Sequence, residues 1–219
     1  NTLPSVLVFT AINVTHGQFE LVNSSSVPIF NFTQQQVNDG EIQFVHDGNE
    51  FAPSYYVKVN EVVLDTTPAP ATIIFNKKPV ITLSSGSITF TEKGTAIAID
   101  FGLNVTDDRS MLSNATVAIT SNFISGEDVL SFVDQAGIIG VYDGGIGLLS
   151  LTGSSVIANY QLALRNITYS DTSSNPSVLP RTISFSVNDG ALDSNTVMRV
   201  INIIPVDDAP VLVGSGGSF

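Results

Sequence analysis

Between residues 96 and 204, apolar and polar side chains alternate with a period of two in several short runs. One run places Ile97, Ile99 and Phe101 on the same predicted face. Such alternation is typical of a β-strand that has one buried face. Further runs contain Val117 and Ile119, then Ile183, Phe185 and Val187, and, less regularly, Val200, Asn202 and Ile204.

Turn-forming sequences separate these runs. They lie at residues 125–126, 143–145, 173–176 and 188–190, and consist mainly of Gly, Ser, Asn and Asp. Many short strands joined by frequent turns predict a two-sheet β-sandwich.

Residues 156–165 interrupt the strand pattern. Val156, Tyr160, Ala163 and Leu164 are spaced as on one face of a helix, and either Ser154 or Ser155 is a suitable cap. The spacing predicts one short helical segment within an otherwise all-β fold.

The chain contains a long-period repeat. Residues 57–65 match residues 185–193, residues 42–47 match residues 167–172, and residues 79–87 match residues 210–218, at offsets of 128, 125 and 131. A period of about 130 residues is the size of an autonomous domain.

The repeat predicts three domains. Residues 1–77 form the end of one domain, residues 78–208 a complete domain, and residues 209–219 the start of another. By the repeat offset, the first domain lacks roughly its first 50 residues. Either those residues come before Asn1 in a longer protein, or the domain is a shortened variant.

Composition narrows the function classes. The chain has 219 residues and no cysteine, which excludes disulfides and thiolate metal sites. Its net charge of −12, from 20 acidic and 8 basic residues, argues against nucleic acid or an anionic membrane as a partner. The surplus carboxylates are ligands that calcium prefers, although acidity can also serve solubility alone. No apolar run approaches the ~18 residues that span a bilayer.

Sequence motifs give no indication of an enzyme. No nucleophile elbow or phosphate-binding loop occurs. The neighbours Glu127 and Asp128 face opposite ways on a strand, so we interpret them as a solvated turn rather than a glycosidase pair. His16 and His46 have no companions that would complete a zinc site, and we interpret both as structural.

Two families of repeat resemble this chain. FTQQQVNDGEIQFVHDGNE at residues 32–50 resembles the chondroitin-sulfate-proteoglycan (CSPG) type repeat, which is a cadherin-like sandwich. SGEDVLSF (125–132), YQLALRNITY (160–169), RTISFSVNDG (181–190) and PVDDAP (205–210) resemble bacterial cadherin-like repeats of large secreted surface adhesins. The resemblance implies tandem cadherin-like (immunoglobulin-like) β-sandwich domains, an extracellular location and calcium at the domain junctions.

The resemblance also implies the calcium ligands. Glu92 occupies the position of a first-strand ligand, and Asp207 and Asp208 lie in the following linker. Together these three residues predict a site at the carboxyl end of residues 78–208. The next repeat would supply further ligands, so we expect calcium binding at this site to be weak or absent in this chain.

A second acidic group is implied at the other end of the same domain. It consists of Asp107, Asp108 and Asp189, which correspond to the family's ligands for the preceding junction. That linker, however, reads Asn76-Lys77-Lys78-Pro79 where the next linker reads Asp207-Asp208-Ala209-Pro210, so two lysines replace a ligand and its spacer. An ammonium group repels calcium, so our hypothesis is that one of these lysines forms an ion pair with the acidic group. The alternative is that these Asp residues simply cap turns.

The leading function is mechanical: a non-enzymatic, extracellular stalk module of a bacterial surface protein, in which calcium stiffens the joints between neighbouring repeats of the same chain. The alternative is a module that binds a host-cell or matrix glycan or protein directly. The absence of Trp argues against an aromatic glycan platform.

Overall fold

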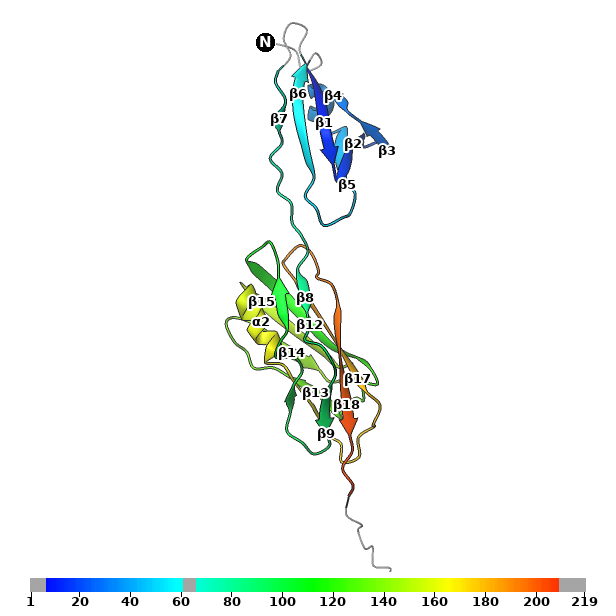
Figure 1. The fold of residues 1–219 in the computed structure, drawn as a ribbon, viewed down its shortest axis with the longest axis vertical. Coiled ribbons are helices and arrows are strands. Elements are labelled where there is room, and N and C mark those ends of the chain that lie inside the picture. Colours follow the sequence, from blue (N-terminus) through cyan, green and yellow to red (C-terminus); the bar gives the residue numbers. More distant parts are fainter. Residues whose placement is uncertain (1–6, 61–65, 209–219) are drawn as a thin grey trace, which may run out of the picture. The chain divides into compact units, whose positions relative to one another are not determined.

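The structure is a computed structural model, and it describes residues 7–60 and 66–208. The chain divides into two compact units, Asn1–Lys77 (unit 1) and Lys78–Phe219 (unit 2), shown in Figure 1. The predicted start of a third repeat at residues 209–219 lies outside the described residues.

Unit 2 contains a six-stranded sheet, in the order β14-β15-β12-β17-β18-β9. Its strands are β9 (Ile88–Thr91), β12 (Met111–Ser121), β14 (Ile139–Asp143), β15 (Leu148–Val156), β17 (Arg181–Asn188) and β18 (Val197–Ile204). All neighbours in this sheet are antiparallel except β18 and β9, which are parallel.

A second layer covers the inner face of this sheet. It is formed by the three-stranded sheet β10-β16-β13 and the pair β11-β8. The strands are β8 (Val80–Thr82), β10 (Ile97–Ala98), β11 (Asn104–Thr106), β13 (Asp128–Ser131) and β16 (Thr168–Asp171). Helix α2 (Ile157–Arg165) contacts β11, β12 and β15. The predicted all-β sandwich fold is confirmed.

The core of unit 2 draws apolar side chains from both layers. Ile183, Phe185 and Val187 of β17 face inward, as their alternation predicts, and Tyr169 of β16 packs with them in one cluster. Phe90 of β9 meets the Tyr169 ring edge-on, with the ring centroids 5.4 Å apart.

Unit 1 contains two smaller sheets, β4-β1-β6-β7 and β3-β2-β5. The strands are β1 (Val8–Thr15), β2 (Gly17–Leu21), β3 (Ser24–Ile29), β4 (Asn31–Thr33), β5 (Ile42–His46), β6 (Ser54–Asn60) and β7 (Ala69–Pro70), with helix α1 (Gln34–Asn38) after β4. Thr33 and Gln36 form a capping box that starts α1. The buried apolar residues of its core are Ala11, Phe19 and Phe32.

The two units share strand pairings and registers. β1 lies between β4 and β6 as β12 lies between β15 and β17, and β2 pairs with β5 as β13 pairs with β16. Val8 is opposite Asn60 in unit 1, and Asn114 is opposite Asn188 in unit 2. Each unit also has a helix directly after the β4 or β15 strand. Strands β8 to β11 of unit 2 have no counterpart among the described strands of unit 1.

A charged cluster lies inside unit 2. The Arg181 Nε–H group donates to Asp128 Oδ1 at 3.0 Å, and Nη2 donates to Asp171 Oδ2 at 3.1 Å. All three side chains have no solvent exposure. Nη1 donates to the carbonyls of Ser177 and Leu179, so every nitrogen of the guanidinium group donates at least one hydrogen bond.

Several sequence predictions need correction. Asp128 is buried and ion-paired, not part of a solvated turn. Phe101 is 76% exposed, because Asp100 accepts the Gly102 N–H and the Ser84 hydroxyl, and the chain turns after β10. On β18 the outer face carries Val200 and Ile204, while Ile201 and Ile203 face the core.

The predicted helix is confirmed at α2, but its predicted cap is wrong. The N-cap residue is Val156, which makes no side-chain capping bond. Ser155 instead donates its hydroxyl to the Ala136 carbonyl. Tyr160, Ala163 and Leu164 are buried as expected, whereas Val156 is exposed.

We expect Arg181→Ala to destabilise unit 2 by about 3–5 kcal/mol, because it leaves two carboxylates buried without their cation. Urea titration followed by the near-ultraviolet signal of buried tyrosines measures the loss. The triple variant Arg181→Met, Asp128→Asn, Asp171→Asn removes all three charges and should recover much of the stability. A loss below about 1 kcal/mol for Arg181→Ala would contradict this assignment.

Candidate functional site

The predicted ligands form two groups at positions that the strands of unit 2 determine. Asp107 and Asp108 come directly after β11, and Asp189 comes directly after β17. We call these three residues the entry group. Glu92 follows β9, and Asp207 and Asp208 follow β18; we call these three the exit group.

In the entry group, Asp189 is held rigidly. Its side chain is fully buried, and its Oδ1 accepts the N–H groups of Ala191 and Leu192, each at 2.7 Å. Its Oδ2 lies 3.6 Å from Arg109 Nε. The residue therefore caps a turn and also presents a charge to a basic side chain.

Asp107 is the least satisfied member of the entry group. Its Oδ1 accepts the Asp108 N–H at 2.8 Å, but its Oδ2 is buried and has no hydrogen-bond partner. Burial raises the pKa of the Asp107 carboxyl, and the negative charges of Asp189 and Asp108 raise it further. The fold therefore brings Asp107 and Asp189 close enough to repel each other.

The hypothesis of an ion pair between Lys77 or Lys78 and the entry group stays a prediction. The basic residue for which the structure gives a distance to this group is Arg109, at Asp189. Sequence reasoning missed it, although it directly follows Asp107 and Asp108 and that adjacency is a usable signal.

In the exit group, Glu92 links the end of β9 to the end of β18. Its backbone N–H donates to the Ile204 carbonyl at 2.9 Å, and its Oε2 accepts the Val206 N–H at 2.8 Å. The side chain is 2% exposed. The metal-ligand role of Glu92 stays a prediction, and the fold gives this residue a structural role.

Lys93 lies between two carboxylates of the exit group. Its ammonium contacts Asp208 Oδ1 and lies 3.4 Å from Glu92 Oε1, a buried oxygen that has no hydrogen-bond partner. The hydrogen bond to Asp208 raises the pKa of Lys93, and Glu92 adds to the effect. Lys93 has a φ of 61°, a left-handed conformation that is uncommon for residues other than glycine. Asp207 is exposed.

Neither group forms a complete calcium site by itself. Calcium takes six to eight oxygen ligands, and no three acidic or histidine side chains in residues 7–60 and 66–208 are placed to hold a metal ion. At each end a basic side chain, Arg109 or Lys93, already faces the carboxylates. To hold the ion, either group would need further oxygen ligands and displacement of its basic side chain.

A family model described as cadherin-like matches residues 1–78. This match confirms the cadherin-like resemblance for unit 1. Within the described residues, no helix is long and apolar enough to cross a membrane. A comparison with curated proteins finds no significant match.

Several solved structures are similar over most of the chain at low identity. Domains 4 and 5 of the S-layer protein SbsC are 12% identical, with 87% of this chain and 71% of that chain covered and a TM-score of 0.29. The C-terminal domain of the antigen I/II-family protein AspA of Streptococcus pyogenes is 6% identical, with 90% and 85% covered and a TM-score of 0.38. The C-terminal domain of the BspA polypeptide of Streptococcus agalactiae is 9% identical, with 92% and 87% covered and a TM-score of 0.37.

We expect Asp107→Asn to alter how stability depends on pH. Because folding raises the pKa of Asp107, the native state holds this proton at pH values where the unfolded chain has lost it. Stability from this group is therefore fully present below the unfolded pKa of about 3.9 and is lost as pH rises through the folded pKa. Asp107→Asn removes that loss, so the variant should gain stability relative to wild type between about pH 4 and pH 7.

Urea midpoints of the two proteins across this pH range give the measurement. Asp143→Asn is the matched control for loss of one negative charge, since Asp143 accepts the Gly145 N–H at an exposed turn. A stability difference between Asp107→Asn and wild type that does not change with pH would contradict the repulsion within the entry group.

Proposed function

We propose that this chain is a load-bearing repeat of an extracellular adhesion-type protein, namely a stalk segment of a bacterial surface adhesin. The observation that carries the proposal is the parallel pairing of β9 with β18, which are near the beginning and the end of unit 2. The cadherin-like family match of unit 1 supports the same class of protein.

The parallel pairing places chain entry and chain exit at opposite ends of unit 2. Residue Ile81 lies beside Asn195, whereas Thr91 lies beside Ile204. The eight residues of β18 separate these two points by roughly 26 Å at about 3.3 Å per residue. Force applied through the two ends therefore runs along both strands and loads their hydrogen bonds together, in shear.

Side chains form hydrogen bonds between residues 81–92 and residues 195–206 of unit 2. At the entry end the Asn195 amide donates to the Ile81 carbonyl and accepts the Ile81 N–H. Farther along, Arg199 donates to the carbonyls of Ser84 and Ser85. At the exit end Glu92 accepts the Val206 N–H. Side-chain hydrogen bonds thus lie before and after the β9–β18 ladder. They add to the bonds that must break when force is applied along the two strands.

We expect the unfolding force of unit 2 to depend strongly on the direction of pulling. The chain has no cysteine, so paired cysteine variants give clean attachment points. Val80→Cys with Val206→Cys loads β9 and β18 in shear. Thr95→Cys with Val206→Cys pulls apart the adjacent ends of the two strands, so their bonds break one after another. Forced unfolding reports the height of the unfolding barrier. Single-molecule pulling should therefore give a clearly higher unfolding force for the Val80 and Val206 pair.

The Thr95 and Val206 pair is the matched control, because it uses the same domain and one shared attachment point. Equal unfolding forces in the two directions would contradict a load-bearing role for the β9–β18 pair. This result would not bear on the assignment of the cadherin-like fold.

Calcium enters this proposal as an ion shared with a neighbouring repeat. The exit group offers Asp207 and Asp208 in the segment after β18, and Glu92 Oε1 has no hydrogen-bond partner. A neighbouring repeat would have to supply the missing oxygens and displace the Lys93 ammonium. If calcium binds only this arrangement of two neighbouring repeats, it stabilises that arrangement by mass action.

We expect Lys93→Gln to strengthen calcium binding by the chain roughly tenfold, because a positive charge within about 4 Å of two carboxylates competes with the metal. Isothermal titration with calcium chloride at low ionic strength measures the change. Lys58→Gln, which removes one positive charge from unit 1, is the matched control. Indistinguishable affinities for Lys93→Gln and Lys58→Gln would show that the exit group is not a calcium site.

A further inference from the structure

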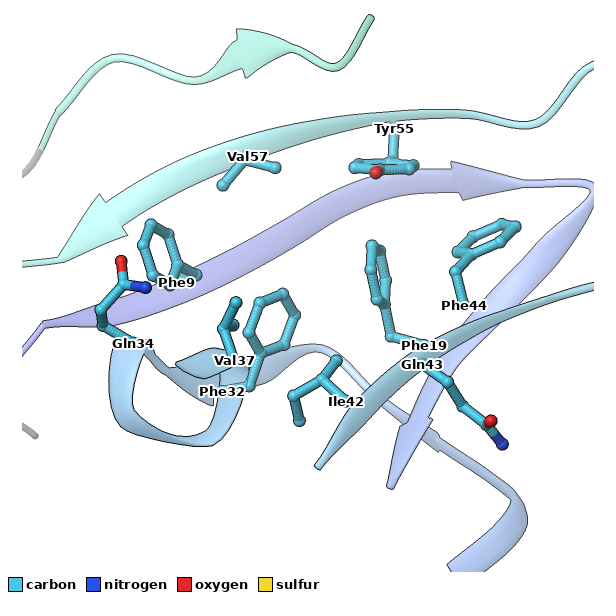
Figure 2. Close-up of a pocket in the computed structure, with 10 residues that line it drawn as sticks. All are labelled: Phe9, Phe19, Phe32, Gln34, Val37, Ile42, Gln43, Phe44, Tyr55 and Val57. Carbon is cyan, nitrogen blue, oxygen red and sulfur yellow. The ribbon is translucent and has the colours of Figure 1, made fainter. Parts of the chain in front are cut away.

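Unit 1 contains an open apolar cavity with a volume of about 340 Å³, shown in Figure 2. It lies beside β5, where Phe44 is opposite Phe19 as Tyr169 of unit 2 is opposite Leu130. The aromatic residues of its lining are Phe9, Phe19, Phe32, Phe44 and Tyr55. None of the described residues that line it is charged, so its walls alone do not specify the chemistry of a ligand.

Unit 2 contains a cavity whose wall includes charged side chains. Its volume is about 490 Å³, and it is lined by residues from two segments, 84–89 and 96–101, together with Arg199. Ile88 of β9 and Ile97 of β10 contribute apolar surface, and the Phe101 side chain, which also lines the cavity, is 76% exposed. A mainly apolar wall with a few fixed polar groups is typical of a small-molecule site.

Arg199 is held in this wall from one side. Its side chain is 7% exposed. Its Nη1 donates to the carbonyls of Ser84 and Ser85 and lies 3.5 Å from Asp100 Oδ2. These contacts with the described residues all pass through Nη1. The Nε atom is buried and has no hydrogen-bond partner among the described residues.

Asp100 is held by donors other than Arg199. Its side chain has no solvent exposure. Its Oδ1 accepts the Ser84 hydroxyl and the Gly102 N–H, and its Oδ2 accepts the Ser84 N–H at 3.0 Å. The carboxylate is thus fixed on the Nη1 side of the guanidinium group and does not serve Nε.

Arg181 shows that the fold of unit 2 can satisfy a buried guanidinium group. Each of its nitrogens donates at least one hydrogen bond, to Asp128, to Asp171 or to backbone carbonyls. Arg199 is buried to a similar degree but keeps one donor without an acceptor. A buried donor without an acceptor costs stability, so its position in the wall of a cavity indicates an acceptor that comes from outside the chain.

We propose that this cavity of unit 2 binds a small organic anion, namely a carboxylate joined to a ring. The Nε–H and Nη2–H bonds of a guanidinium group point the same way and match the two oxygens of a carboxylate. In Arg199 this edge is left over by the contacts through Nη1. The ring of the ligand packs on Phe101 and on Ile97. Because Nε is enclosed in the free protein, binding also requires a small movement of the wall around it.

The charge of Arg199 outweighs the charge of the chain as a whole at this site. The net charge of −12 repels anions, but salt screens exposed charges beyond about 8 Å at physiological ionic strength. Asp100 lies closer, yet it accepts three hydrogen bonds and faces Nη1. The nearest charge to the unused edge is therefore that of Arg199 itself.

Two pairs of compounds test the site and identify the kind of ring. Benzoate and glucuronate carry a carboxylate on an aromatic ring and on a sugar ring, and benzyl alcohol and glucose are their neutral matches. In titrations of the 219-residue chain followed by NMR, at least one acid should bind about tenfold or more tightly than its neutral match, as a charge-assisted hydrogen bond predicts. The shifted amides should lie in residues 84–89 and 96–102. The proposal is wrong if neither acid exceeds its neutral match, or if the shifts lie elsewhere.

Two variants test the contacts with the bound acid. Arg199→Lys keeps the positive charge but removes the Nε edge, so it should lower the affinity about fivefold or more. Phe101→Ala changes an exposed side chain and spares the buried contacts, so it tests the site even if Arg199→Lys does not fold. It should lower the affinity about threefold or more through lost ring packing.

Phe30→Ala is the matched control for Phe101→Ala, because Phe30 is an exposed phenylalanine of unit 1. This control should bind the acid as the unaltered chain does. Equal affinities of Phe101→Ala and Phe30→Ala would place the ring away from Phe101 and overturn the proposed site.

Discussion

Two β-sheets are stable together only when the apolar face of each is buried against the other. Unit 2 meets this requirement because β9 and β10 bring Phe90 and neighbouring apolar residues onto Tyr169. Unit 1 keeps the same central pairings and registers but has an open cavity where Phe44 replaces Tyr169. The units differ in this coverage and at one sheet edge, because β3 pairs with β2 in unit 1 whereas β14 pairs with β15 in unit 2.

Charge in unit 2 is organised around basic side chains that each face carboxylates. Arg181 pairs with Asp128 and Asp171 inside the core, whereas Lys93 and Arg109 face acidic residues near the chain's exit and entry. With 8 basic against 20 acidic residues in the chain, basic residues placed at carboxylates reduce repulsion where the fold concentrates it. Lys93 faces Glu92 and Asp208, two of the residues that the sequence predicts as calcium ligands.

Much of the fold was predictable, because buried strands alternate. Ile183, Phe185 and Val187 point into the core as expected. Arg181 lies in the same phase of the alternation, but its charge argued against burial, and only a spatial partner such as Asp128 explains its place. Glu92 lies beside the segment after β18, where its Oε2 accepts the Val206 N–H. The contact of Lys93 with that group was missed, because its left-handed backbone is not visible in sequence.

Filling of the core and the proposed bearing of load in unit 2 both depend on β9. In unit 2, β9 both fills the core and pairs in parallel with β18. In unit 1 the counterpart of β18 is β7, which pairs with β6 over only Ala69 and Pro70 and has no described partner on its other side. Among the described strands, a parallel pair of this kind therefore occurs in unit 2 and not in unit 1. The mechanical proposal accordingly rests on unit 2, where the strand that completes the core is also the strand that bears load.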